Sequence, residues 1–216
     1  MVVKRIGGYT RESTEADQNA REIYGYFYSK GWTLNAICGL LGNIEGESDY
    51  NPWRWEGDDL QSFYATDYKL HGYGLFQFTA NDDYPTKYIR ESIATSLTGY
   101  APNFSDRMGN VSDAYAQMEY LDLYADYIKK SEHPLSYSEY KASTLAPDYL
   151  ASTWLWNYER PRQQDGESSE PIRQASAIYW YNKFSDEPVP PTPPTPLPKG
   201  RKMPVWMMIG YNVQIR

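Results

Sequence analysis

Apolar residues recur every three or four positions in several segments of the chain, which is the spacing of one face of an α-helix. The first segment runs from about Glu15 to Lys30, with Ser13 or Thr14 as its N-cap. The second runs from Leu34 to about Glu47 and begins after Thr33, which is a further N-cap. Later helices are predicted at Thr86–Leu97, Ser112–Glu132, Pro147–Tyr158 and Glu170–Phe184, the last two with a proline in the first turn.

Residues 48–80 lack this helical spacing. Gly57, Gly72 and Gly74 interrupt any helix, and short extended pieces around Tyr73–Phe78 predict a small β-hairpin region. The predicted fold class is therefore mainly α (α+β), a helical domain with one small β excursion. A cleft between the two parts is the expected place for an extended ligand.

The C-terminal part has a different composition. Seven of the eleven positions from Pro188 to Pro198 are proline, which is typical of a stiff polyproline spacer. Strict alternation of apolar residues then predicts a single strand. We expect a globular domain at residues 1–186, a Pro-rich and basic linker at 187–202, and a C-terminal strand or docking segment at 203–216.

A lone strand leaves backbone groups unpaired along both edges. Residues 203–216 are therefore expected to dock onto another protein by strand addition, the alternative being a strand that folds back on its own domain. Stable membrane insertion is not expected, because one strand cannot satisfy its backbone hydrogen bonds in a bilayer.

Charge and composition narrow the classes of partner. The chain has 21 Lys and Arg and 28 Asp and Glu, and four of the basic residues lie beyond residue 187. Residues 1–187 thus carry 17 positive and 28 negative charges, a net charge of −11 that disfavours nucleic-acid binding. The 22 Tyr and 7 Trp suit either stacking on sugar rings or a Tyr-rich core. A single cysteine and an N-terminus without an apolar signal region indicate synthesis in a reducing cytoplasm.

Two carboxylates, Glu45 and Glu47, close the second helix. At 100° per residue Glu47 falls between Ala36 and Leu40, inside the apolar stripe, whereas Glu45 falls well outside it. Half-burial against apolar surface disfavours the charged form of a carboxyl group, so Glu47 has the setting of a general acid. The alternative is a helix-end glutamate that bonds Ser48 or a local backbone amide.

Four blocks of the sequence stand out: GWTLNAICGLLGNIEGESDYNPW at 31–53, GYGLFQFT at 72–79, WNYERP at 156–161 and AIYWYNKF at 177–184. In content and order they resemble the phage tail lysozyme family of the lysozyme-like superfamily. The chain resembles this family over roughly residues 15–185, so residues 1–186 are expected to form a lysozyme-like catalytic domain. The resemblance implies a tail-tip enzyme of short-tailed phages that is made in the host cytoplasm and acts on the host cell wall. Its implied substrate is the peptidoglycan glycan strand, and the tail knob or another tail-tip protein is the partner expected for residues 203–216.

The resemblance also implies roles for single residues. The family's catalytic glutamate corresponds to Glu47, and Tyr73 and Gln77 fall where relatives line the sugar cleft. Hairpin packing for Tyr73 and a buried amide network for Gln77 are the structural alternatives. Tyr158 and Glu159 are expected to close the cleft from the helical side, unless Glu159 forms an ion pair with Arg160.

The second carboxylate of the reaction is less determined. In animal c-type lysozymes an aspartate precedes the aromatic-glycine pair, whereas Gly72 stands at that position here, which excludes a covalent aspartyl intermediate there. Asp58, Asp59 and Asp67 lie on the connecting segment, and Asp67 is the preferred residue to orient a water molecule for inverting hydrolysis. Transglycosylation without water stays open.

Other chemistries lack the required residues. His71 and His133 belong to no zinc-ligand pattern, and Cys38 lies in an apolar helix that favours a structural thiol. No metal or other cofactor is expected. The alternative from another class is a non-catalytic wall-binding or structural tail component that keeps the lysozyme-like fold.

Overall fold

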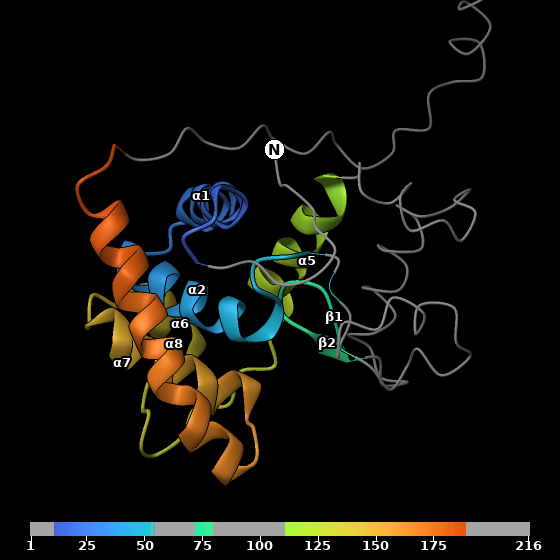
Figure 1. Cartoon of the computed structure of the whole chain (residues 1–216). Coiled ribbons are helices and arrows are strands. Elements are labelled where there is room, and N and C mark those ends of the chain that lie inside the picture. The colour runs from blue at the N-terminus through green and yellow to red at the C-terminus, as the bar shows by residue number, and fades with distance from the viewer. Residues whose placement is uncertain (1–10, 53, 55–71, 80–110, 189–216) are drawn as a thin grey trace, which may run out of the picture.

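A computed structural model describes residues 11–52, 54, 72–79 and 111–188 of the chain (Figure 1). The described part is mainly helical, as the hydrophobic pattern predicted. Its elements in chain order are α1 (Thr14–Ser29), α2 (Leu34–Ser48), β1 (Gly72–Tyr73), β2 (Phe78–Thr79), α5 (Val111–Tyr124), α6 (Tyr137–Lys141), α7 (Pro147–Trp154), the π-helix η3 (Leu155–Glu159) and α8 (Gln163–Phe184).

The first two helices begin at the predicted caps. The Ser13 hydroxyl accepts a hydrogen bond from the backbone N–H of Ala16, and the Thr33 hydroxyl accepts one from Ala36, both at 3.1 Å. Helix α2 ends where Asp49 and Tyr50 take left-handed backbone angles, with φ of 47° and 61°. Two consecutive left-handed residues turn the chain sharply away from the helix axis, just beyond the candidate carboxylates.

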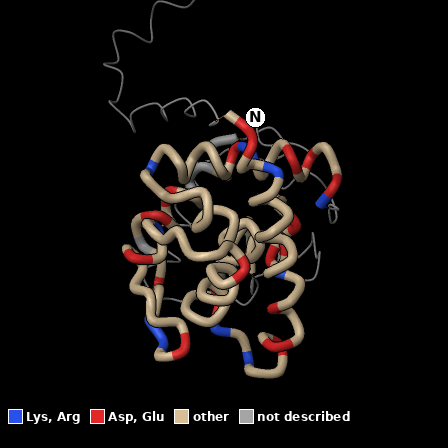
Figure 2. Tube along the Cα trace, turned by 90° about the vertical axis from the view of Figure 1, so that its left-hand side faces the viewer, with Lys and Arg blue, Asp and Glu red and all other residues tan. Residues whose placement is uncertain are grey.

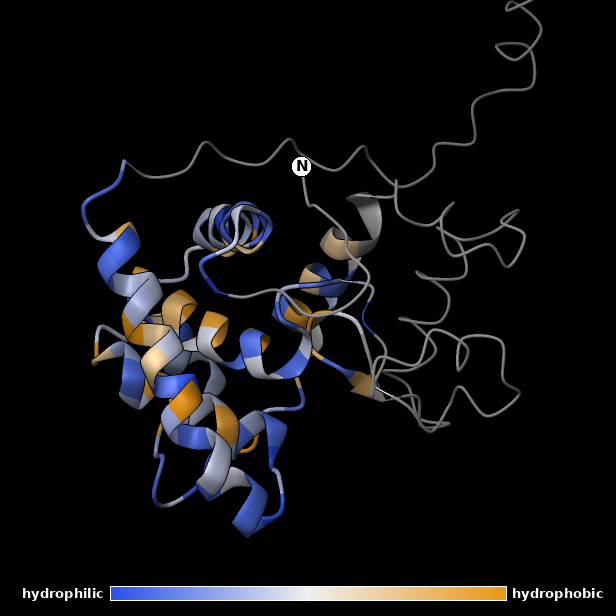
Figure 3. Ribbon diagram, in the orientation of Figure 1, coloured by the Kyte–Doolittle hydropathy of each residue, from blue (hydrophilic) through white to orange (hydrophobic). Residues whose placement is uncertain are grey.

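Helix α2 is the central element of the described part, with α1, α7 and α8 packed around it (Figure 1). Hydrophobic positions gather where α2, α7 and α8 meet (Figure 3). Glycines allow this close approach: a Cβ atom at Gly42 would lie 2.3 Å from the carbonyl oxygen of Arg173, and one at Gly39 would lie 2.8 Å from Leu150 Cβ. Every residue from Ala36 to Ile44 is buried, so α2 is enclosed on nearly all sides.

Aromatic side chains fill much of this core. Trp154 packs against Tyr158, Tyr140 and Trp32, with ring centroids 4.6, 5.2 and 6.2 Å apart. Trp180 forms a second centre against Tyr50, at 5.4 Å. Much of the aromatic content therefore serves the core, the alternative to sugar stacking that the composition left open.

Two helix boundaries differ from the prediction. Helix α5 ends at Tyr124 instead of Glu132, because the following residues bond to the C-terminal helices: the N–H of Ile128 donates to the carbonyl oxygen of Asn157 at 2.9 Å. The Asn157 side chain donates to the carbonyl oxygen of His133, also at 2.9 Å. Tertiary hydrogen bonds thus outweigh the local helical pattern.

Helix α8 begins at Gln163, seven residues before the predicted start, so Pro171 lies inside it. The predicted helix Pro147–Tyr158 divides into α7 and the π-helix η3, with Pro147 in the first turn as expected. Helix α6 was not predicted, although Ser136 and Glu139 form a capping box that the sequence pattern S-x-x-E signals.

Within the predicted β region, the described residues form one antiparallel pair, with Gly72 opposite Thr79 and Tyr73 opposite Phe78. The predicted helix Thr86–Leu97, the linker beyond residue 188 and the strand at 203–216 lie outside the described residues. In the described part of the chain, the acidic residues are distributed over several elements (Figure 2). Among the described helices, none combines the length and the apolar character that crossing a membrane requires.

Candidate active site

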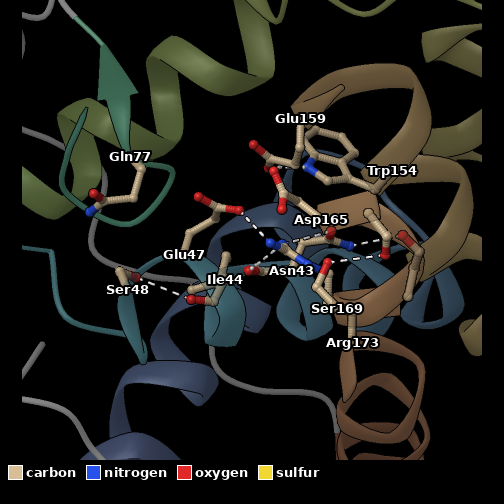
Figure 4. Close-up of polar contacts among 12 residues, drawn as sticks. Asn43, Ile44, Glu47, Ser48, Gln77, Trp154, Glu159, Asp165, Ser169 and Arg173 are labelled. Atoms are coloured by element: carbon tan, nitrogen blue, oxygen red, sulfur yellow. Dashed lines mark hydrogen bonds and ion pairs between the residues drawn. The ribbon is translucent and has the colours of Figure 1, made fainter. Parts of the chain in front are cut away.

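Glu47 lies in the last turn of α2 with its side chain 18% exposed, which agrees with the half-burial expected from the helical wheel. Its Oε1 accepts a hydrogen bond from Nη2 of Arg173 at 2.7 Å (Figure 4). Ser48, the partner considered as an alternative, instead directs its hydroxyl to the carbonyl oxygens of Ile44 and Leu75. Glu47 is therefore ion-paired across to α8 and is not a locally capped helix-end residue.

Arg173 is fixed by α2 itself. Its Nη1 donates to both the backbone carbonyl oxygen and the side-chain Oδ1 of Asn43, each at 3.1 Å. The Arg173 side chain is 10% exposed, and its Nε is buried with no hydrogen-bond partner among the described residues. The guanidinium group has little freedom to leave, so a positive charge stays beside Glu47.

Glu159 is the second carboxyl group of this site (Figure 4). Its Oε1 accepts a hydrogen bond from the indole N–H of Trp154 at 3.0 Å. Burial of the carboxyl group raises the pKa of Glu159 well above its usual range, and the negative charge of Glu47 raises it further. Arg173 and the Trp154 hydrogen bond act in the opposite direction. The proposed ion pair between Glu159 and Arg160 is not formed, because Arg160 donates to Asp126 at 2.7 Å.

The π-helix η3 determines where Glu159 lies. Its wider turn is closed by a hydrogen bond of 2.8 Å from the N–H of Arg160 to the carbonyl oxygen of Leu155. Arg160 then takes a left-handed backbone with φ of 51°, which ends the helix directly after Glu159. Short π-helical turns are frequent at functional sites, and this one presents Glu159 beside the end of α2.

Tyr158, the other residue expected on the helical side, packs into the core. Its ring lies against Trp154 at a tilt of 35°, and burial raises the pKa of its hydroxyl well above the usual value. The ring is therefore a structural support for the segment that carries Glu159.

Gln77 lies on the other side of Glu47 from Glu159 in the view of Figure 4. Its side-chain nitrogen donates to the carbonyl oxygens of Arg54 and Gly74, at 3.1 and 3.0 Å. This geometry fits the amide-network alternative, since the amide holds the turn between β1 and β2. Tyr73 lies in β1, where its backbone pairs with that of Phe78 in β2. Four other residues considered from the sequence lie outside the described residues: Asp58, Asp59, Asp67 and His71.

The β turn is attached to the helices at two points. The Ser48 hydroxyl lies 3.1 Å from the carbonyl oxygen of Leu75, and the backbone N–H of Leu75 donates to Oε1 of Gln117 at 2.8 Å. Gly74 has φ of +83°, and a Cβ atom there would lie 2.2 Å from the same Gln117 oxygen. These contacts fix the turn relative to the end of α2.

Glu45 lies outside the apolar stripe of α2, as the helical wheel indicated, but other segments of the chain cover it. Its carboxylate is 16% exposed and accepts two hydrogen bonds from Arg11 at 2.8 Å, one on each oxygen. It also accepts hydrogen bonds from the hydroxyls of Tyr50, at 2.8 Å, and Ser176. The helical wheel assumed one buried face, whereas α8 and the N-terminal segment cover the opposite face of α2.

Sequence reasoning missed Arg173, although a signal for it was present. At 100° per residue Arg173 falls on the same stripe as Ala177, Trp180 and Phe184, all of which are buried. A cation in an apolar stripe requires a buried partner. The partner itself was not predictable, because 126 residues separate Arg173 from Glu47.

The remaining reactive residues are structural in the described part of the chain. Cys38 is buried, and burial raises the pKa of its thiol, which agrees with the predicted structural role. His133 Nδ1 lies 3.3 Å from the Thr153 hydroxyl. Within the described ranges, no group of three His, Cys, Asp or Glu side chains has an arrangement that would hold a metal ion.

Comparison with known proteins confirms the family that the sequence blocks resemble. Residues 18–184 match the phage tail lysozyme family. The chain is also similar to Morphogenesis protein 1 of Bacillus phage B103, with 31% identity over 174 residues. That alignment covers 79% of this chain and 40% of the relative, so the chain spans less than half of that protein's length. The match over most of the domain, through both α2 and the η3–α8 segment, makes this chain a member of the phage tail lysozyme family.

Proposed function

We propose that this protein is a muramidase-type glycosidase of the phage tail that cleaves the β-1,4 link between N-acetylmuramic acid and N-acetylglucosamine in peptidoglycan. One observation carries the proposal: Glu47, the glutamate of the family's Glu-Ser pair, is half-buried at the end of α2 and paired with Arg173 at 2.7 Å. A carboxyl group held in a fixed orientation beside an apolar core is suited to proton transfer.

Glu47 is the proposed general acid. It donates a proton to the glycosidic oxygen as the bond to the anomeric carbon breaks, so that the sugar leaves as an alcohol. Arg173 then holds the carboxylate that results, because its guanidinium group already donates to Glu47 Oε1. Asp67 is the proposed residue that orients the attacking water for inversion, with Asp58 and Asp59 as the other candidates.

The proposed place of action is the bacterial cell wall, reached by the virion tail tip at the start of infection. Membership of the phage tail lysozyme family supports this placement, as does similarity to a protein called Morphogenesis protein 1. Local opening of the wall for genome entry is the role that follows from a wall-cutting enzyme carried on the tail.

Digestion of purified cell walls, followed as loss of turbidity between about pH 5 and pH 8, tests the activity. Glu47→Gln keeps the side-chain shape and removes the proton, so turnover should fall by roughly 10²–10⁴. Glu167→Gln, an exposed carboxylate on α8, is the matched control and should keep wild-type turnover. Wild-type digestion by Glu47→Gln would refute the catalytic assignment.

The products separate the remaining alternatives. Mass spectrometry of digested muropeptides should find a reducing-end sugar if water is the nucleophile, and an anhydro-muramyl end if the enzyme is a transglycosylase. No turbidity loss at any pH by the folded wild-type protein would instead favour a non-catalytic wall-binding or structural tail component.

A further inference from the structure

Asn43 is a polar residue in the middle of the core, one helical turn before Glu47 on α2, and its side chain is fully buried. Its Nδ2 donates to the carbonyl oxygens of Gly39 on α2 and Ala151 on α7, each at 3.0 Å. Its Oδ1 accepts a hydrogen bond from Nη1 of Arg173 on α8, at 3.1 Å. One buried amide group therefore links α2, α7 and α8.

The orientation of the Asn43 amide group is determined by these partners. Backbone carbonyl oxygens only accept hydrogen bonds, and a guanidinium group only donates them. A flipped amide group would place Oδ1 against the two carbonyl oxygens and Nδ2 against Arg173, so all three hydrogen bonds would be lost. The packing of α2 against α7 thus directs an acceptor at Arg173.

The guanidinium group of Arg173 uses its two terminal nitrogens for two different residues of α2. Nη1 donates to Oδ1 and to the carbonyl oxygen of Asn43, and Nη2 donates to Oε1 of Glu47 at 2.7 Å. Because the guanidinium group is planar, fixing Nη1 also fixes the direction in which Nη2 points. Asn43 therefore determines, through Arg173, how the carboxyl group of Glu47 is held.

The two carboxyl oxygens of Glu47 have different surroundings. Oε1 accepts from Arg173, whereas Oε2 has no hydrogen-bond partner among the described residues and points away from the guanidinium group (Figure 4). A protonated carboxyl group has one hydroxyl oxygen and one carbonyl oxygen that only accepts. Since Oε1 is the acceptor for Arg173, Oε2 is the oxygen suited to carry a proton.

We propose that Asn43 is a positioning residue of the reaction, which holds Arg173 on Oε1 of Glu47 and so makes Oε2 the oxygen that donates the proton. The inference rests on the proposed glycosidase function. In the step itself, the proton moves from Oε2 to the glycosidic oxygen, which keeps the electron pair of its breaking bond to the anomeric carbon. Arg173 stays on Oε1 and stabilises the negative charge that the carboxylate gains.

The first test is the kinetics of Asn43→Ala in the full-length protein, on soluble glycan fragments of purified walls. A misplaced carboxyl group slows the chemical step and not substrate binding, so kcat should fall by roughly 10–100-fold with KM within about twofold. Ser152→Ala is the matched control and should keep the wild-type kcat, because it removes a buried hydrogen bond of 2.8 Å between α7 and α8 that does not involve Arg173. A wild-type kcat in folded Asn43→Ala would overturn the proposal.

A double-mutant cycle separates positioning from a general structural role. Arg173→Lys keeps a positive charge but lacks the planar fork that joins Asn43 to Glu47. If Asn43 acts through Arg173, adding Asn43→Ala to Arg173→Lys should lower kcat further by less than about twofold. A further fall as large as in the wild-type background would overturn the proposal. Should the alanine variant not fold, Asn43→Ser takes its place, because a serine hydroxyl can still bond the carbonyl oxygen of Gly39 one turn earlier.

A third measurement needs no activity, and its first part needs no variant at residue 43. A guanidinium group held at both terminal nitrogens rotates slowly about its Cζ–Nη bonds, so NMR of arginine-labelled wild-type protein should find separate Nη resonances that are lost in Arg173→Lys. In Asn43→Ala these resonances should broaden or merge. Resonances that are averaged in the wild type, or unchanged in Asn43→Ala, would overturn the proposal. Absence of wall digestion by a wild type with separate resonances would overturn only the proposed function.

Discussion

A Cβ atom at Gly46 would lie 2.8 Å from Cζ of Arg173, so the guanidinium group occupies the space that a side chain at residue 46 would need. The same guanidinium group reaches Glu47 one residue further along α2. Glycine at this position therefore allows Arg173 to lie flat on the helix and pair with the candidate catalytic glutamate.

Gly46→Ala should displace Arg173 and weaken its ion pair with Glu47. An exposed helix position normally gains stability from alanine, but here we expect a loss of about 1–3 kcal/mol in the free energy of unfolding, from overpacking. Denaturant unfolding measures it. A double-mutant cycle with Arg173→Ala supplies the control, because Gly46→Ala should cost little once the guanidinium group is absent. Equal costs in both backgrounds would contradict this account.

Glu45→Gln should lower stability and leave turnover per folded molecule nearly unchanged. The substitution leaves Arg11 without its bidentate carboxylate partner and disturbs the contacts with Tyr50 and Ser176. We expect a loss of roughly 1–3 kcal/mol in the free energy of unfolding, the range for charge-assisted hydrogen bonds. Glu167→Gln, on the exposed face of α8, should change it by less than about 0.5 kcal/mol.

Comparison of Glu45→Gln with Glu47→Gln separates the two adjacent carboxylates. Glu45→Gln should lower the stability measured by thermal or denaturant unfolding. Glu47→Gln should instead reduce the digestion of purified walls. Loss of turnover by Glu45→Gln at a temperature where it is fully folded would show that its network also supports the reaction.

Acid should destabilise the fold in part through His133. Burial lowers the pKa of this histidine, although the nearby charges of Glu170 and Glu132 act in the opposite direction. The unfolded chain therefore takes up a proton at higher pH than the folded protein, and stability present above about pH 6.5 is lost as the pH falls. Denaturant unfolding of wild type and His133→Asn at pH 7 and pH 5 measures this. The variant should lose less stability between the two pH values, and an identical loss would exclude His133 as a contributor.

Deletion of residues 199–216 should leave wall digestion intact and abolish incorporation into phage particles. The reason is that the predicted strand at 203–216 would pair with a strand of the tail knob or another tail-tip protein. Incorporation is measured by blotting purified particles. A full-length variant in which Val205, Met207 and Ile209 are replaced by lysine tests the alternation itself and should also fail to incorporate. Loss of soluble folding on deletion would instead indicate a strand that folds back on its own domain.

The local features of this protein followed from the sequence alone. N-caps at Ser13 and Thr33, the first-turn proline at 147 and the half-burial of Glu47 depend on residues within a few positions of one another. Periodicity and capping report such short-range chemistry directly. The order of the motif blocks likewise indicated the family before any fold was considered.

Tertiary structure alone decided how the site is completed. Arg173 and Glu159 are brought near Glu47 from segments more than a hundred residues away in the sequence, and periodicity contains no information about such partners. The same limit applies to Glu45, because the periodicity of one helix predicts a single buried face. Only packing of α8 and the N-terminal segment around α2 turned its opposite face into a second buried ion-pair network.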